Sequence, residues 1–89
     1  MYIRGLDANE DYKRQLILEL RRNIDSVEPL TKGSATVYVV TSRFEEAGRL
    51  IDEYCDLYHG ASANEIVDGF SVEFSDTEDA IEFYNFLKG

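Results

Sequence analysis

The chain has 89 residues, with a single cysteine, a single proline, a single histidine and no tryptophan. One cysteine cannot form an intramolecular disulfide, which excludes a disulfide-stapled secreted scaffold. No stretch approaches the roughly 20 consecutive apolar residues of a membrane span, and the opening MYIRGLDANED lacks the apolar segment of a signal peptide. We therefore expect one cytoplasmic domain covering residues 1–89, with no membrane association.

Basic residues are scarce in one part of the chain only. The net charge is −9, from 18 acids and 9 bases. Residues 1–49 hold eight of each, whereas residues 50–89 hold ten acids and only one base, Lys88. A negative field repels nucleic acids and anionic membranes and attracts basic proteins, so direct nucleic-acid binding is disfavoured. The plainer alternative is that the acids only keep a small protein soluble.

The periodicity of the apolar residues predicts both helices and strands. We expect helices near residues 8–27, 43–58 and 76–87, and strands near residues 35–41, 64–67 and 70–74. The order α-β-α-β-β-α indicates an α+β two-layer sandwich, with three helices on a small three-stranded antiparallel sheet. The residues expected in the core are Leu16, Leu20, Val37, Val39, Leu50, Ile51, Tyr54, Phe70, Val72, Phe74, Ala80, Phe83 and Leu87.

Three sequence patterns are typical of helix N-termini. Asp7 is followed three residues later by Glu10, Ser42 by Glu45, and Ser75 by Glu78, as in capping boxes. We therefore expect the three helices to begin at these positions. The segment MYIR before Asp7 is interpreted either as a short strand or as an apolar anchor.

The segment DGFSVEFSDTEDAIEF resembles the third strand and second helix of the RNA-recognition motif, in which a Gly-Phe-Gly-Phe-Val-x-Phe strand leads into an acid-Ala helix. The resemblance covers residues 68–83 and implies a ferredoxin-like strand–helix arrangement. It departs from the family in lacking one stacking aromatic, in placing Glu73 in the strand and in having no base before Gly69. Asp68-Gly69 also favours a two-residue hairpin turn, with positive φ at both positions.

Cys55 and His59 lie four residues apart on the second expected helix, beside Asp52 and Asp56. That spacing supplies half of a zinc site, but a structural zinc needs four ligands and no other Cys or His exists. We therefore expect no metal, no cofactor and no catalytic residue. A small enzyme built on Cys55 and His59 is the least favoured alternative.

The acidic residues of the last two helices include pairs at four-residue spacing, Asp52 with Asp56 and Glu78 with Glu82. Such like-charged pairs cost tenths of a kcal/mol each. Carboxylates four apart rise by about 6 Å along a helix, close to two phosphate spacings of ~3.4 Å on a DNA strand. The expected partner-binding residues, forming one continuous negative face, are Asp52, Glu53, Asp56, Glu78, Asp79 and Glu82.

These observations favour a non-enzymatic protein-binding domain that docks on a basic surface of a protein partner. In its sharpest form it is a nucleic-acid mimic, resembling small phage-encoded inhibitors of DNA- or RNA-binding proteins. The alternative is a self-associating structural domain, a homodimer in the simplest case. In it, Arg14, Arg21 and Arg22 would meet the acidic helices of a second copy. The face of the strand TVYVV that carries Tyr38 and Val40 would be buried between the copies.

Overall fold

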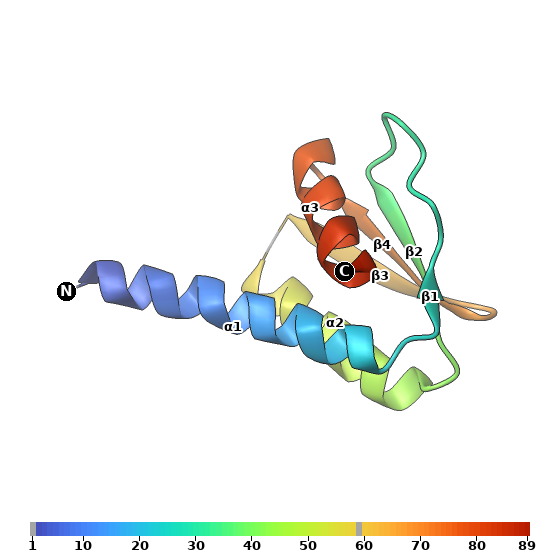
Figure 1. Cartoon of the computed structure of the whole chain (residues 1–89), viewed down its shortest axis with the longest axis horizontal. Helices are drawn as coiled ribbons and strands as arrows, with labels where there is room; N and C mark the ends of the chain where they lie inside the picture. The colour runs from blue at the N-terminus through green and yellow to red at the C-terminus, as the bar shows by residue number, and fades with distance from the viewer. Residues whose placement is uncertain (1, 59) are drawn as a thin grey trace.

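The computed structural model of the protein describes residues 2–58 and 60–89, with side chains described from Asp11 onward. The elements in chain order are α1 (Tyr2–Arg22), β1 (Ser26–Val27), β2 (Thr36–Val40), α2 (Phe44–Leu57), β3 (Ala61–Ile66), β4 (Gly69–Phe74) and α3 (Thr77–Lys88). The fold is α+β, as expected, with the described helices on one face of an antiparallel sheet (Figure 1). Within the described residues, no helix is both long and apolar enough to cross a membrane.

The sheet has the strand order β1-β2-β4-β3. Strands β2 and β3 flank β4 and are joined through α2, which gives a split β-α-β arrangement of the ferredoxin-like kind. The most central pairing aligns Val72 of β4 with Val37 of β2 and Ala63 of β3. Because β4 has a neighbour on both sides, its alternating residues fix which face of the whole sheet meets the helices.

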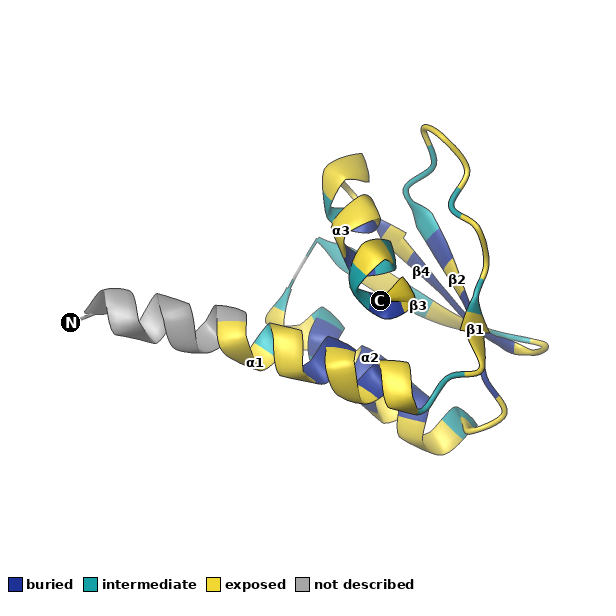
Figure 2. Ribbon diagram, viewed as in Figure 1, coloured by how far each residue is buried: buried dark blue, intermediate teal, exposed yellow. Residues whose placement is uncertain are grey.

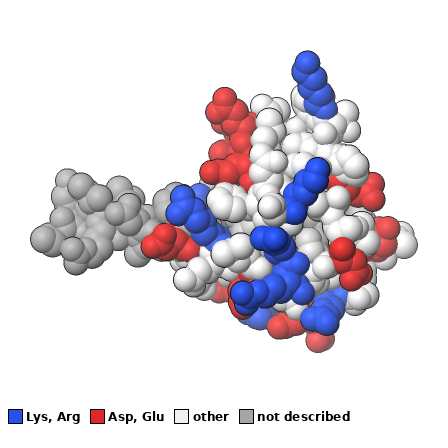
Figure 3. Space-filling model, viewed as in Figure 1, with Lys and Arg blue, Asp and Glu red and all other residues white. Residues whose placement is uncertain are grey.

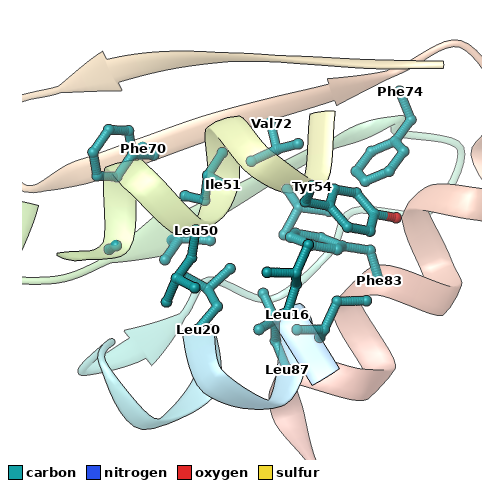
Figure 4. Packing of buried hydrophobic residues seen from close by; sticks show 14 of the residues in the cluster. Leu16, Leu20, Leu50, Ile51, Tyr54, Phe70, Val72, Phe74, Phe83 and Leu87 are labelled. Carbon is teal, nitrogen blue, oxygen red and sulfur yellow. The ribbon is translucent and has the colours of Figure 1, made fainter. Parts of the chain in front are cut away.

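The core lies between that face and the helices, and it matches the sequence expectation at every listed position. Phe70, Val72 and Phe74 project from β4 toward Ile51 and Tyr54 of α2 (Figure 4). The other expected core residues are likewise buried, and Ile17 and Ala47 join them. Figure 2 shows the buried residues lining the inner sides of the two layers. The spacing of apolar residues, every second residue in strands and every 3.6 residues in helices, therefore located the core correctly.

The expectation of three strands is wrong, because Ser26 and Val27 form a fourth, β1, at the edge beside β2. The backbone N–H of Asp25 donates to the Val40 carbonyl at 2.8 Å, and that of Glu28 donates to the Tyr38 carbonyl at 2.9 Å. The element order is therefore α-β-β-α-β-β-α, and the first helix ends at Arg22 rather than near residue 27. A two-residue strand is too short to show any alternation in sequence.

Several expected boundaries also move. Helix α1 already begins at Tyr2, so residues 2–4 are helical and Asp7 lies inside the helix instead of capping it. Helix α2 has Arg43 at its N-cap position and no capping side chain, so Ser42 does not form the expected capping box. Strand β3 begins at Ala61, three residues before the expected start. The cap of α3 is Asp76 rather than Ser75, since its carboxylate accepts a hydrogen bond of 2.9 Å from the Glu78 backbone N–H. Ser75 instead extends the sheet by donating its backbone N–H to the Gly60 carbonyl.

The expected hairpin is present, but its turn differs. Ile66 pairs with Gly69, so the two turn residues are Val67 and Asp68. Among the described residues only Gly33 and Gly89 have positive φ, which excludes the expected positive-φ turn. Gly69 is required for another reason, because a Cβ there would overlap the Val39 carbonyl oxygen of β2. The glycine thus allows close approach of two backbones.

Candidate protein-binding surface

Asp52 and Asp56 lie one turn apart on α2, and both are exposed. Neither carboxylate accepts a hydrogen bond or ion pair from another described residue, whereas most other acids of this helix do. Their proximity leaves an uncompensated repulsion of tenths of a kcal/mol in the folded protein. Together with Glu45, which is also exposed and unpaired among the described residues, these two residues carry the available negative charge of α2.

Both residues border a groove of about 580 Å³ between α2 and β3. Phe44 and Phe70 lie in it with ring centroids 5.7 Å apart, and Gly48 lets the Phe70 ring pack close to α2. The lining residues are Phe44, Glu45, Gly48, Arg49, Asp52, Glu53, Asp56, Glu65 and Phe70. The lining residues include five acids, one base and two aromatic residues, so the groove is acidic and partly aromatic.

Arg49, the base of the groove, is already engaged within α2. Its guanidinium donates to Glu46 at 3.1 Å and lies 3.6 Å from Glu53. Glu53 also accepts a hydrogen bond of 2.7 Å from the Tyr12 hydroxyl of α1, and that bond raises the pKa of Tyr12. Glu53 therefore connects α1 and α2. The negative charge that remains available in the groove lies on the other acids that line the groove.

The acids of α3 have different surroundings. Asp79 is half-buried and accepts a hydrogen bond from the Tyr58 hydroxyl, which follows α2 in the chain. This bond, together with burial and the charge of Asp79, raises the pKa of Tyr58 to about 12. Asp79 therefore holds the end of α2 against the start of α3.

Glu78 and Glu82 border a separate hollow of about 410 Å³ on α3, together with Ile81, Asn85 and Phe86. Glu82 also borders a narrow cleft that Lys13 and Arg14 of α1 line from the other side. On the face shown in Figure 3, acidic side chains gather over the N-terminal end of α3, and basic ones lie over its C-terminal end and over α1. Five of the six acids expected to form one face thus line two separate hollows, and the sixth, Asp79, is bound to Tyr58.

Sequence reasoning missed Glu45 and Glu65 as members of the groove. Glu45 is recognisable as a first-turn acid of α2, but nothing in the sequence places it near β3. Glu65 reaches the groove only because β3 pairs with β4 in a register that sets Glu65 opposite Phe70. That register could not be read from ASANEI, which lacks a clear alternation of apolar and polar residues.

The face of the sheet that points away from the helices carries few large side chains. Tyr38 of β2 is 47% exposed there, between half-buried Thr36 and Val40. On β4, Ser71 stands directly opposite Tyr38, and Glu73 stands opposite Thr36. Of the arginines expected to serve self-association, Arg14 lies 3.8 Å from Asp11, and Arg21 and Arg22 are exposed at the end of α1.

Cys55 is half-buried on α2. Burial, and then the charges of Asp52 and Asp56, raise the pKa of its thiol to about 11, so the thiol is protonated at neutral pH. No group of three or more His, Cys, Asp or Glu side chains in the described part of the chain is arranged to hold a metal ion. The pairing of Cys55 with His59 lies outside the described residues.

Comparisons with protein families, curated proteins and solved structures find no significant match to this chain. The functional argument therefore depends on the surface itself, above all on the groove between α2 and β3.

Proposed function

We propose that this protein is a non-enzymatic binding domain that docks on a basic surface of a protein partner through the α2–β3 groove. The observation that carries the proposal is the state of Asp52 and Asp56. Both are exposed, no described residue pairs with them, and they border a groove whose single base is held by Glu46 and Glu53.

The rest of the groove supports the same partner chemistry. Glu45 and Glu65 add negative charge, while Phe44 offers a half-buried aromatic ring that packs on buried Phe70. A lysine or arginine side chain gains from carboxylates at its charged end and from aromatic rings along its length. Complementary charge also accelerates the encounter and fixes the register of docking.

A nucleic-acid-binding protein is the partner class that this surface fits best. The carboxylates of Asp52 and Asp56 follow the helix at a rise of about 6 Å, near the spacing of alternate phosphates. The imbalance of −9 in residues 50–89 adds a negative field that attracts such a protein and repels the nucleic acid itself. In this form the protein acts as a nucleic-acid mimic and inhibitor.

The test is capture of partner proteins from a cell lysate at low and high salt. It compares the parent protein with two variants that carry the same change in net charge. Asp52→Lys/Asp56→Lys reverses charge in the groove. Asp25→Lys/Glu28→Lys makes the same change in net charge at two exposed residues flanking β1. We expect a nucleic-acid-binding protein that elutes with salt, is lost from the groove variant and is retained by the control. Equal capture by both variants would show that the acids only confer solubility.

A further inference from the structure

Strand β3 is an edge strand, paired with β4 on one side only. It runs for six residues, Ala61–Ile66, in a continuous register without a bulge. Its sequence ASANEI contains neither proline nor lysine, the residues that commonly block open edges. The opposite edge of the sheet is only the two-residue β1. Among the described residues, the sheet therefore has one long edge without proline, lysine or a bulge.

The hydrogen bonds of the sheet show which backbone groups point outward. Ser75 donates its N–H to the Gly60 carbonyl, so the carbonyl of residue 60 is directed toward the β4 side. Because these directions alternate along an antiparallel strand, Ala61, Ala63 and Glu65 turn their N–H and C=O groups away from β4. These groups form a template for one more strand.

The side chains of the same residues face the helices. Ala61, Ala63 and Glu65 stand opposite Phe74, Val72 and Phe70, whose side chains belong to the core. Residues of an added strand that stood opposite them would direct their side chains to the same face. That face is where the α2–β3 groove opens, and Glu65 lines the groove.

We propose that the β3 edge accepts an extended, basic segment of the partner as an additional antiparallel strand, with alternate lysine or arginine side chains entering the α2–β3 groove. The backbone of the segment bonds to Ala61, Ala63 and Glu65, and its cations meet Asp52, Asp56 and Glu65. The proposal rests on the proposed function and gives it a binding mode, since main-chain bonds supply affinity and alternate side chains supply specificity.

A second copy of the chain is the other occupant that an open edge attracts. Pairing of β3 with β3 would bring Asp52, Asp56 and Glu65 of one protomer toward the same residues of the other. Like charges brought together in this way are repulsive, whereas a basic strand neutralises them. Charge complementarity therefore favours a basic partner segment over self-pairing.

The first experiment uses synthetic peptides and the unmodified protein. One peptide alternates arginine and threonine, and its control has the same composition with all arginines in one block. We expect the alternating peptide to bind at least tenfold more tightly by fluorescence anisotropy. We also expect it to slow amide hydrogen exchange at Ala61, Ala63 and Glu65. Equal binding of the two peptides, without protection at these amides, would overturn the proposal.

Backbone methylation tests the register directly. In an antiparallel pair, the residues opposite Ala61, Ala63 and Glu65 direct both their N–H groups toward β3 and their side chains into the groove. Methylating the backbone nitrogens of the arginine residues should therefore abolish binding of the peptide. Methylating the backbone nitrogens of the threonine residues should leave the affinity within about threefold of the parent peptide. Equal effects of the two modifications would contradict strand addition.

Proline variants of the protein provide the matched test. Ala63→Pro removes a backbone N–H that points away from β4, so every hydrogen bond between β3 and β4 is kept. Proline is tolerated at such edge positions for this reason. Val67→Pro places the same residue in the turn, where the native side chain is 98% exposed. We expect at least a tenfold loss of peptide affinity for Ala63→Pro and almost none for Val67→Pro. Equal affinities would overturn the proposal, and the methylated peptides decide the question if Ala63→Pro fails to fold.

The two proposals fail in distinguishable ways. Partner capture that depends on Asp52 and Asp56 but survives Ala63→Pro would overturn strand addition and leave the proposed function intact. A homodimer by sedimentation that Ala63→Pro dissociates would assign the edge to a second copy, which also overturns strand addition. Binding of the alternating peptide without any groove-dependent capture would instead contradict the proposed function.

Discussion

Helices α2 and α3 both carry more acids than bases but use their acids differently. Each carries acids in its first turn and a pair of acids at four-residue spacing, and each buries an apolar stripe in the same core. In α3, Asp76 caps the helix and Asp79 binds Tyr58. In α2, Asp52 and Asp56 bind no other described residue. The carboxylates of Asp76 and Asp79 therefore contribute to stability, whereas those of Asp52 and Asp56 remain a free surface.

The difference arises from where each carboxylate stands relative to helix ends and neighbours. Acids near a helix N-terminus satisfy free N–H groups and interact favourably with the helix dipole. Asp56 lies in the last turn of α2, where the dipole disfavours negative charge and where α2 has no base. The same residue type thus stabilises α3 and slightly destabilises α2.

The largest expected effect concerns Asp79. Asp79→Ala should lower the free energy of unfolding by about 1–2 kcal/mol, because a half-buried hydrogen bond to a charged acceptor is lost. Asp56→Ala is the matched change on α2 and should leave stability unchanged or raise it by up to about 0.5 kcal/mol. Urea unfolding of both variants measures the contrast. Equal losses would mean that the two helices use their acids alike.

A second effect appears at alkaline pH. The pKa of Tyr58 is raised from 10.0 to about 12 in the folded protein, so folding favours the protonated hydroxyl. This contribution to stability is complete below pH 10 and is lost as the pH rises through 12. We expect Asp79→Ala to return the Tyr58 titration toward its ordinary range, as followed by tyrosinate absorbance. Asp56→Ala should leave it in place, and a shift with that variant would contradict the contrast.

The smallest effect is a gain of stability at the proposed binding surface. Asp56→Lys should raise the free energy of unfolding by about 0.5 kcal/mol, since it replaces a repulsion with an Asp52–Lys pair at favourable spacing. It also places a base in the last turn of α2. The same variant should weaken partner capture, so thermal unfolding and capture move in opposite directions. A loss of stability would show that Asp56 has a structural role.

Much of the fold follows from local patterns in the sequence. The alternation of Phe70, Val72 and Phe74 fixed the inner face of β4, and the helical stripes fixed the inner sides of α2 and α3. The strand β1 and the start of β3 could not be predicted. One has only two residues, and the other is rich in small residues that take their structure from pairing with β4.

The candidate surface could be predicted less well than the core. The acids of α2 were found from their spacing, but Glu65 became part of the groove only through the β3–β4 register. The bond between Tyr58 and Asp79 joins residues 21 positions apart and is invisible to any local pattern. Sequence locates charge along a helix, whereas tertiary contacts decide which charges remain available.

The place of β4 in the sheet has a consequence for synthesis of the chain. This strand lies in the middle of the sheet, yet it is synthesised after the other three strands of that sheet. Until then Val37 and Val39 of β2 have only the two-residue β1 beside them, which cannot form a stable sheet. The first 49 residues also carry no net charge to keep nascent chains apart. The last forty residues therefore supply both the missing strand and the repulsion, and truncated chains that end before Gly69 are the ones exposed to aggregation.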